Sequence, residues 1–297
     1  MYQVDNAVIM AAGTASRFAP LSYERPKALI SVKGEVLIER QIRQLKEAGV
    51  PEIYVVVGYK AEQFAYLEEK CGVHLVENPE YNTRNNPEYN TRNNHASIYA
   101  VRSILGNTYI CSADNYFSEN PFEAEVSDSY YAAVYADGPT KEWCMDHGAD
   151  DYITGVTVGG RDAWYMLGHV FWSESFSRRF IEILEAEYDL PETKDLLWES
   201  IYMKHMDELP MKIRRYADNV VFEFDTLDEL RLFDTSYVTD TRSEILRDVA
   251  VRLGCAESAL VNLTAYKDGT NEAAGFTFDV GDKHYGYSYT TKDIRSM

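Results

Sequence analysis

An apolar run that ends in a small-residue loop constrains the fold of this chain more than any other stretch. Residues 7–12 (AVIMAA) are apolar, and residues 13–16 (GTAS) follow at once. A short strand that runs into such a loop exposes several backbone N–H groups on one concave side. Phosphate oxygens suit that surface, and Arg17 and Lys27 supply two flanking cations. The stretch alone leaves open an ordinary strand-to-helix connection whose basic residues are solvated.

Strand and helix patterns alternate over the first hundred residues. The predicted strands are residues 8–12, 53–57, 73–76 and 108–112. Apolar residues at helical spacing predict a helix at 36–48. This alternation predicts an α/β fold with a Rossmann-like mixed, mostly parallel sheet. Ligands bind beyond the carboxyl ends of such strands, so we expect Gly13, Gly58 and Tyr59 at one edge.

Carboxylates follow two of the predicted strands. Asp114 comes directly after the fourth strand, where a divalent metal that bridges phosphates would be held. A lone Asp in this position is more often a helix N-cap or turn residue, and that alternative stays open. Further along, a strand at 220–224 carries Glu223 and Asp225 on one side. Asp225 is also placed to cap a predicted helix at 227–233.

From about residue 130 the pattern changes to antiparallel strands. These are predicted at 130–135, 152–158 and 163–172, with Glu142 and Trp143 in the first connection. Helices are predicted at 175–188 and 194–205. The second helix carries Asp195, Trp198 and Glu199 at i, i+3, i+4 spacing, which puts them on one face. Such a face is a poor core face, and a half-buried Trp with solvated acids is the open alternative.

An octapeptide, NPEYNTRN, occurs twice in tandem, at residues 78–85 and 86–93. Structural repeats run to tens of residues, so this pattern indicates a local duplication in a polar loop, where insertion costs little. We expect one copy to be redundant. The second copy adjoins Asn94 and Ser97 and is the better candidate for function.

Charge and composition exclude several classes of protein. The formal net charge is −19, which repels polyanions, and no basic stripe offsets it, so nucleic acid is not expected as a partner. A cationic small molecule is tolerated. The 4 cysteines show no metal spacing and are expected to be reduced core thiols. No apolar run approaches the ~20 residues of a membrane span. We therefore expect a cytoplasmic enzyme without a membrane partner.

The motifs resemble those of the nucleotidyltransferases that activate sugar phosphates and phospho-alcohols. The signature is Ala11-Ala12-Gly13-x-x-Ser16-Arg17-Phe18-x-Pro20-Leu21 followed by Pro26-Lys27-Ala28-Leu29. The closer resemblance is to bacterial CTP:phosphocholine cytidylyltransferases. It rests on Val57-Gly58-Tyr59, Tyr89 with Asn93-Asn94-x-x-Ser97, Ala113-Asp114-Asn115-Tyr116, Glu142-Trp143, Asp195-x-x-Trp198-Glu199 and Glu223-x-Asp225. The family has one copy of the octapeptide, which leaves open whether the Asn pair 85–86 or 93–94 contacts the nucleotide.

This resemblance implies a sheet of the nucleotidyltransferase (glycosyltransferase-A-like) type and a reaction of phosphocholine with CTP. The products would be CDP-choline and pyrophosphate, formed by in-line attack without a covalent enzyme intermediate. The implied catalytic residues are Arg17, Lys27, Asp114 and Asp225, of which the two aspartates would hold Mg²⁺. The implied nucleotide-binding residues are Ala11, Ala12, Gly13, Thr14, Ser16, Gly58, Tyr59, Asn94 and Ser97. The implied choline-binding residues are Trp143, Asp195, Trp198 and Glu223.

The acceptor is the less constrained of the two substrates. A quaternary ammonium donates no strong hydrogen bond, so it needs carboxylates and aromatic faces, each cation–π contact contributing roughly 0.5–2 kcal/mol. Trp143 and Trp198 therefore favour choline over 2-aminoethylphosphonate or a sugar 1-phosphate, both of which stay open. A non-catalytic nucleotide- or choline-binding regulatory protein is a further alternative. Lys27, Asp114 and Asp225 argue against it, because binding alone does not require all three.

We predict a catalytic domain at residues 1–235 and a small helix-plus-hairpin domain at residues 236–297. The tail carries a predicted capping box, Thr241-x-x-Glu244, and strands between 262 and 290 with a turn at Gly281-Asp282. It resembles the opening of bacterial choline kinases but is too short for a catalytic loop. A hairpin that packs on the catalytic domain or on a second subunit is the alternative, so a homodimer is left open.

Overall fold

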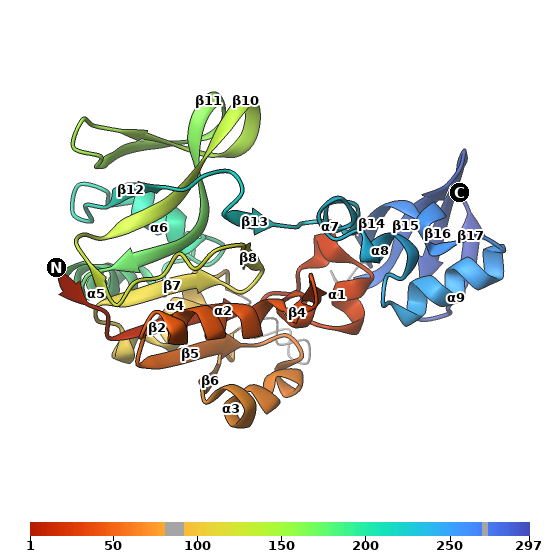
Figure 1. The fold of residues 1–297 in the computed structure, drawn as a ribbon, viewed down its shortest axis with the longest axis horizontal. Coiled ribbons are helices and arrows are strands. Elements are labelled where there is room, and N and C mark those ends of the chain that lie inside the picture. Colours follow the sequence, from red (N-terminus) through yellow and green to blue (C-terminus); the bar gives the residue numbers. More distant parts are fainter. Residues whose placement is uncertain (81–91, 269–272) are drawn as a thin grey trace. The chain divides into compact units, whose positions relative to one another are not determined.

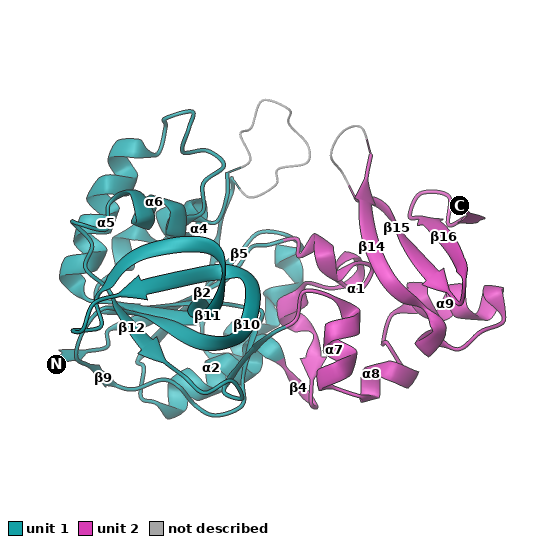
Figure 2. Cartoon of the chain, turned by 90° about the horizontal axis from the view of Figure 1, so that it is seen from above, with its two compact units in different colours: residues 1–13, 37–223 teal, residues 14–36, 224–297 magenta. Residues whose placement is uncertain are grey.

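The computed structural model describes residues 1–80, 92–268 and 273–297. The chain forms two compact units, each built from discontinuous segments (Figure 2). Unit 1 comprises residues 1–13 and 37–223, and unit 2 comprises residues 14–36 and 224–297. These units differ from the predicted division at residue 235, because segment 14–36 groups with the C-terminal part of the chain. Within the described residues, no helix has the length and apolar character that crossing a membrane requires.

Unit 1 is built on a mixed seven-stranded sheet (Figure 1). In spatial order its strands are β12 (Lys212–Arg215), β10 (Tyr130–His147), β11 (Ile153–Trp172), β7 (Thr108–Ser112), β2 (Asn6–Ala11), β5 (Glu52–Val57) and β6 (His74–Glu77). The β7–β2–β5–β6 half is parallel, and so is the β10–β12 pair, whereas β11 is antiparallel to both neighbours. The prediction of a mixed, mostly parallel sheet is confirmed.

The parallel strands deliver their carboxyl ends to one edge of the sheet. β2 is buried almost throughout, which explains why its sequence is a continuous apolar run rather than an alternating one. The Tyr59 N–H donates to the Ala12 carbonyl oxygen at 3.1 Å, and the Ala113 N–H donates to the Met10 carbonyl oxygen at 3.2 Å. The segments after β5 and β7 therefore lie beside the end of β2, as the sequence predicts.

Two long strands replace the three antiparallel strands that the sequence predicts. Glu142 and Trp143 lie within β10, so their assignment to a connection is wrong. The Gly-Pro pair at 138–139 has the composition of a turn, yet Pro139 pairs with Arg161 across the β10–β11 ladder. Register shifts on both sides of this pair absorb the proline and glycines as irregularities within a bent hairpin.

The helices of unit 1 are α2 (Leu37–Glu47), α3 (Tyr66–Cys71), α4 (His95–Ala100), α5 (Glu174–Glu187) and α6 (Trp198–Lys204). Two short antiparallel pairs complete the unit: β1 (Tyr2–Gln3) with β9 (Glu125–Val126), and β8 (Asn115–Phe117) with β13 (Val221–Glu223). The helices predicted at 36–48 and 175–188 are confirmed by α2 and α5. The helix predicted at 194–205 is too long at its start, because α6 begins at Trp198 and Asp195 precedes it.

Unit 2 combines short helices with a second sheet. Its helices are α1 (Leu21–Glu24), α7 (Leu227–Phe233), α8 (Ser236–Thr239) and α9 (Glu244–Leu253). Its strands are the pair β3 (Ser31–Val32) and β4 (Glu35–Val36), and the sheet β14 (Val261–Lys267), β15 (Ala273–Val280), β16 (Lys283–Ser288) and β17 (Ile294–Ser296). The predicted turn at Gly281-Asp282 joins β15 to β16. The repeat copy at 86–93 lies largely outside the described residues.

The predicted capping box of α9 is wrong in its first residue. Ser243 is the N-cap, and its hydroxyl accepts from the Leu246 N–H at 3.0 Å. The Thr241 hydroxyl instead donates to the Glu257 carboxylate at 2.6 Å. The backbone at the N-cap must be extended, and Ser243 supplies both that conformation and the side-chain acceptor.

Arg231 on α7 ties unit 2 together, and its removal tests this packing. Its buried guanidinium donates to the carbonyl oxygens of Leu260 at 2.6 Å, Glu257 at 2.8 Å and Tyr237 at 3.3 Å. Arg231→Leu would leave these acceptors unpaired, so we expect the unfolding free energy from urea titration to fall by about 2–3 kcal/mol. The exposed Arg247→Leu control should change it by less than about 0.5 kcal/mol. Equal losses in both variants would contradict this role.

Candidate functional site

The predicted cations and one predicted carboxylate lie together in unit 2. A 3₁₀ turn, Ser16–Phe18, is entered through Ala15 in the left-handed conformation (φ 44°) and carries Arg17. The Arg17 Nη1 atom lies 2.5 Å from Asp225 Oδ2, and the Lys27 Nζ atom lies 3.8 Å from Asp225 Oδ1. The side chains are 73% exposed for Arg17 and 6% exposed for Lys27. Asp225 therefore has one exposed and one buried cation beside it.

The backbone of Asp225 is fixed by the start of α7. Thr226 is the N-cap of this helix and forms a capping box with Glu229. The Glu229 carboxylate also accepts from the Asp225 N–H at 2.7 Å. The predicted capping role of Asp225 is therefore wrong, and its carboxylate is engaged with the two cations instead.

Most of the other predicted phosphate and nucleotide residues lie at the strand ends of unit 1. Asn94 and Ser97 instead lie at the start of α4 and within it, and Thr14 and Ser16 belong to unit 2. Ala11 ends β2, Gly58 and Tyr59 follow β5, and Asp114 lies between β7 and β8. Ser97 on α4 is buried, and its hydroxyl accepts from the Asn78 side chain at 3.2 Å. No group of three or more His, Cys, Asp or Glu side chains in the described parts of the chain is arranged to hold a metal ion.

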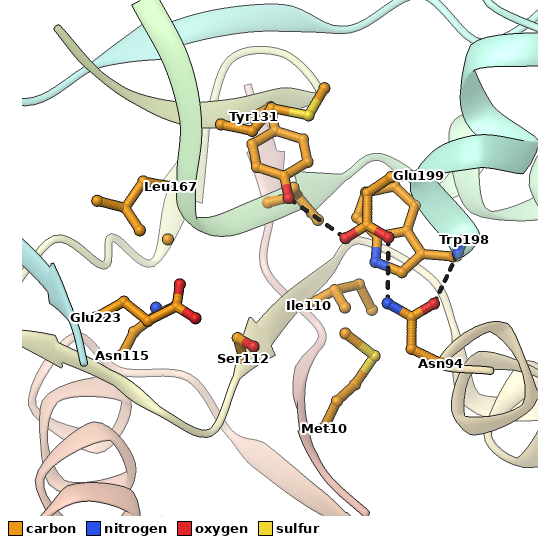
Figure 3. A pocket seen from close by; sticks show the side chains of 13 residues that line it. Met10, Asn94, Ile110, Ser112, Asn115, Tyr131, Leu167, Trp198, Glu199 and Glu223 are labelled. Atoms are coloured by element: carbon orange, nitrogen blue, oxygen red, sulfur yellow. Dashed lines mark hydrogen bonds between the residues drawn. The ribbon is translucent and has the colours of Figure 1, made fainter. Parts of the chain in front are cut away.

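A pocket in unit 1 collects residues from strands β2, β7, β8, β10, β11 and β13 and from α6 (Figure 3). Its charged lining residues are Glu199 and Glu223, and no Lys, Arg or His of the described residues lines it. Asn94, Tyr131 and Trp198 also contribute to its wall. The pocket is therefore negatively charged and suits a cationic group.

Glu199 is the most unusual residue of this pocket. Its Oε2 atom accepts from the Asn94 amide at 3.1 Å, and its Oε1 atom accepts from the Tyr131 hydroxyl at 3.4 Å (Figure 3). Burial raises the pKa of the Glu199 carboxyl to about 7, and the hydrogen bonds from Asn94 and Tyr131 offset part of that rise. The sequence motif places Glu199 beside Trp198 but assigns it no role. The signal was its position in the Asp195-x-x-Trp198-Glu199 motif.

The aromatic cage that the sequence predicts is not assembled in unit 1. Trp198 lines the pocket but is 1% exposed, and its ring stacks on Tyr131 with centroids 5.8 Å apart. Trp172 packs edge-on against it at 5.2 Å, so its faces are largely covered. Trp143 packs against the hydrophobic core from β10, and neither Trp143 nor Asp195 is among the pocket residues. The pocket unites Trp198 with Glu223 but leaves out the other two predicted choline residues.

Comparison with known proteins identifies relatives of this chain. The MobA-like NTP transferase domain family matches residues 7–87. The chain is 34% identical to the choline-phosphate cytidylyltransferase of Streptococcus pneumoniae over 225 residues, covering 76% of this chain and 95% of that protein. It is 38% identical to the 2-aminoethylphosphonate cytidylyltransferase of Lancefieldella rimae over 242 residues, covering 80% of this chain and 95% of that protein.

A solved structure shows the same fold. The CTP:phosphocholine cytidylyltransferase structure from Streptococcus pneumoniae matches with a TM-score of 0.71 at 33% sequence identity. The match covers 79% of this chain and 99% of that one.

The buried carboxyl of Glu199 should make the stability of the protein depend on pH. Because its pKa is raised to about 7, the stability that it contributes is present below about pH 4.5 and is lost as the pH rises through 7. Glu199→Gln does not titrate, so we expect the variant to exceed the wild type in unfolding free energy at pH 8, by up to about 3 kcal/mol.

Urea titrations at several pH values measure this difference, which should shrink as the pH falls toward 5. The exposed Glu69→Gln variant is the matched control and should show no such trend. A stability gain in Glu199→Gln that is the same at all pH values would contradict the buried-carboxyl interpretation.

Proposed function

The chain belongs to the nucleotidyltransferase family, and we propose that it transfers CMP from CTP to phosphocholine. An oxygen of the phosphocholine phosphate attacks the α-phosphorus in line. One P–O bond forms, the bond to pyrophosphate breaks, and CDP-choline and pyrophosphate leave. The names of the relatives from Streptococcus pneumoniae support both substrates.

The pocket of unit 1 is the observation that carries the choice of acceptor. It is lined by Glu199 and Glu223 and by no basic residue among those described. The hydroxyl groups of a sugar 1-phosphate can donate hydrogen bonds to carboxylates but carry no charge, whereas a trimethylammonium group is a cation and is attracted by them. The net charge of −19 adds a weak attraction of the same sign.

The protein's contribution to such a reaction is positioning and charge neutralisation. We assign Arg17 and Lys27 to the charge that develops on the phosphates, as cations already gathered in unit 2. The backbone N–H groups of residues 11–16 and the residues Gly58 and Tyr59 are assigned to the nucleotide. The described geometry leaves Ser97 a buried hydrogen-bonding role instead.

Mg²⁺ is part of this proposal, with Asp114 and Asp225 as its candidate ligands. Mg²⁺ is commonly bound by one or two carboxylates together with substrate phosphates rather than by an all-protein cage. Single aspartates and the lack of a larger acidic cluster among the described residues fit that mode. When bound, the ion neutralises charge on the phosphates.

A second acceptor, 2-aminoethylphosphonate, is favoured by a specific observation. The faces of Trp198 are covered by Tyr131 and Trp172, which weakens the case for aromatic recognition of a quaternary ammonium. A primary ammonium would use the Glu199 and Glu223 carboxylates as hydrogen-bond acceptors. The relative from Lancefieldella rimae carries that activity in its name.

Residues 236–297 have a proposed role of their own, on which the proposed reaction does not depend. Their likeness to the opening of bacterial choline kinases suits an accessory domain in choline metabolism. A surface for a second copy of the chain is the alternative role.

An acceptor assay tests the proposed function. With CTP and Mg²⁺, we expect pyrophosphate release with phosphocholine at a kcat/KM at least about tenfold above that with 2-aminoethylphosphonate or glucose 1-phosphate, since 1.4 kcal/mol of differential recognition corresponds to tenfold. A coupled phosphate assay after pyrophosphatase measures the release. A preference for 2-aminoethylphosphonate would transfer the assignment to the second acceptor, and no release with any acceptor would refute the activity.

Replacing Asp114 tests the metal assignment. Asp114→Asn keeps the shape but removes a hard anionic ligand, so we expect kcat to fall by about 10²–10³-fold, the loss typical of removing one electrostatic contact to the transition state. Chelation with EDTA should abolish turnover of the wild type, and Mg²⁺ should restore it. Circular dichroism checks the fold. Near-normal kcat in Asp114→Asn would remove this residue from the metal site.

A further inference from the structure

Segment 93–95 is hydrogen-bonded to the segment that leads into α6. The Asn93 amide donates to the Asp195 carbonyl oxygen at 3.0 Å, and the His95 ring Nδ1 lies 2.7 Å from the Leu196 carbonyl oxygen. The Asn93 N–H donates to the Lys194 carbonyl oxygen at 3.2 Å. About a hundred residues separate the two segments in sequence, so these contacts are tertiary and hold α6 against the start of α4.

Both ends of the Asn94 side-chain amide take part in these hydrogen bonds. Its Oδ1 atom accepts from the Trp198 N–H at 2.7 Å, and its Nδ2 atom donates to Glu199 Oε2 at 3.1 Å (Figure 3). The N-cap of α6 is Leu197, which has no side-chain oxygen, so Asn94 supplies the missing acceptor from another segment. One side chain therefore begins the helix and orients its second residue.

These contacts give Asn94 a role in the pocket wall beside the nucleotide role that the resemblance implies. Each end of the amide has one contact, so the oxygen keeps a second lone pair and the NH₂ group a second hydrogen. Turning the side chain to other partners would break the cap of α6 or the hydrogen bond to Glu199, and a buried carboxylate that loses a hydrogen bond is costly. The contacts therefore hold the Asn94 amide in place beside Glu199.

We propose that Asn94 is a positioning residue of the acceptor half of the site, holding the Glu199 carboxylate to receive the cationic group of the acceptor. This inference rests on the proposed function for its substrate. The inference concerns Asn94 and Glu199, whereas the residues assigned to the phosphates are Arg17 and Lys27. Glu199 determines specificity through its charge, and Asn94 determines where that charge lies.

The groups that face Glu199 make its charge sensitive to Asn94. Tyr131 from β10 and Glu223 from β13 are the other titratable residues of the pocket, and no cation of the described residues lines it. Burial raises the pKa of Tyr131 well above its ordinary value, so Tyr131 stays neutral. The hydrogen bond from Asn94 lowers the pKa of Glu199, and its loss would raise that pKa further above 7.

Asn94→Asp separates the two functions of this side chain. The new carboxylate still accepts from the Trp198 N–H and keeps the cap, but it donates nothing to Glu199 and adds a like charge beside it. We expect KM for phosphocholine at pH 7 to rise about tenfold, with KM for CTP within twofold of the wild type. Glu199→Gln should raise KM for phosphocholine similarly and remove its variation with pH near 7.

The pH profile distinguishes positioning from a merely structural role. KM for phosphocholine should fall as the pH rises and Glu199 ionises. In Asn94→Asp this fall should occur at higher pH. The acceptor phosphate titrates near pH 6 in every variant, so the ratio of variant to wild-type KM isolates the effect of Glu199. Asn120→Ala is the matched control, because it removes hydrogen bonds to the Gln44 carbonyl oxygen and from the Phe122 N–H without touching Glu199. It should lower the melting temperature while leaving both KM values within twofold.

A binding measurement separates this inference from the proposed function. Calorimetry with choline, which has no phosphate, requires no turnover and reports the pocket alone. We expect the wild type and Asn120→Ala to bind choline, and Asn94→Asp and Glu199→Gln to bind it at least about fivefold more weakly. Choline binding without cytidylyl transfer would overturn the proposed function and retain this inference. A raised KM for CTP in Asn94→Asp, or unchanged choline binding in both pocket variants, would overturn the inference that Asn94 positions Glu199.

Discussion

The parallel pairing of β2 with β5 and β7 is the constraint on which the rest of unit 1 depends. Pairing in the same direction places the ends of all three strands at one edge, so the segments that follow them converge whatever their sequences. The backbone bonds from Tyr59 to Ala12 and from Ala113 to Met10 fix this convergence at the level of single residues. A chemistry that needs phosphate-binding backbone and a carboxylate at one place is then available from short loops.

Burial of the Glu199 carboxyl in the pocket lowers the stability of the protein when the group is ionised. Burying a carboxylate among apolar side chains disfavours its charged form, and two neutral donors, Asn94 and Tyr131, offset this only in part. A bound cation would remove the remaining penalty, because the charge of Glu199 then has a partner. Under the proposed function, a carboxylate that is unfavourable without a cation would therefore favour binding of the acceptor, which is the usual relation between stability and function at a binding site.

The parts of the fold that follow from local patterns could be predicted from sequence. The helix α2 and the strand ends at Gly58 and Asp114 come from periodicity and from the direction of parallel strands, so they were predicted correctly. The β10–β11 hairpin was not, because its Gly-Pro pair mimics a turn and only the cross-strand ladder reveals continuity. The start of α6 was also misplaced, because Asn94, far away in sequence, determines where that helix begins.

The same distinction between local sequence and tertiary contacts applies to the candidate site. Arg17, Lys27 and Asp225 could be predicted because each belongs to a short motif, and unit 2 brings them together. The orientation of Trp198 could not, since the covering of its faces depends on Tyr131 and Trp172 from other elements.

The ion pairs of unit 2 suggest why the cations are arranged unequally. Lys27 is almost fully buried and needs the Asp225 carboxylate nearby, whereas exposed Arg17 loses little if it exchanges Asp225 for another anion. A phosphate that arrives at this surface can therefore take Arg17 as its partner while Lys27 keeps its place. Under the proposed function, that exchange would leave one oxygen of Asp225 available to Mg²⁺ once the nucleotide is bound.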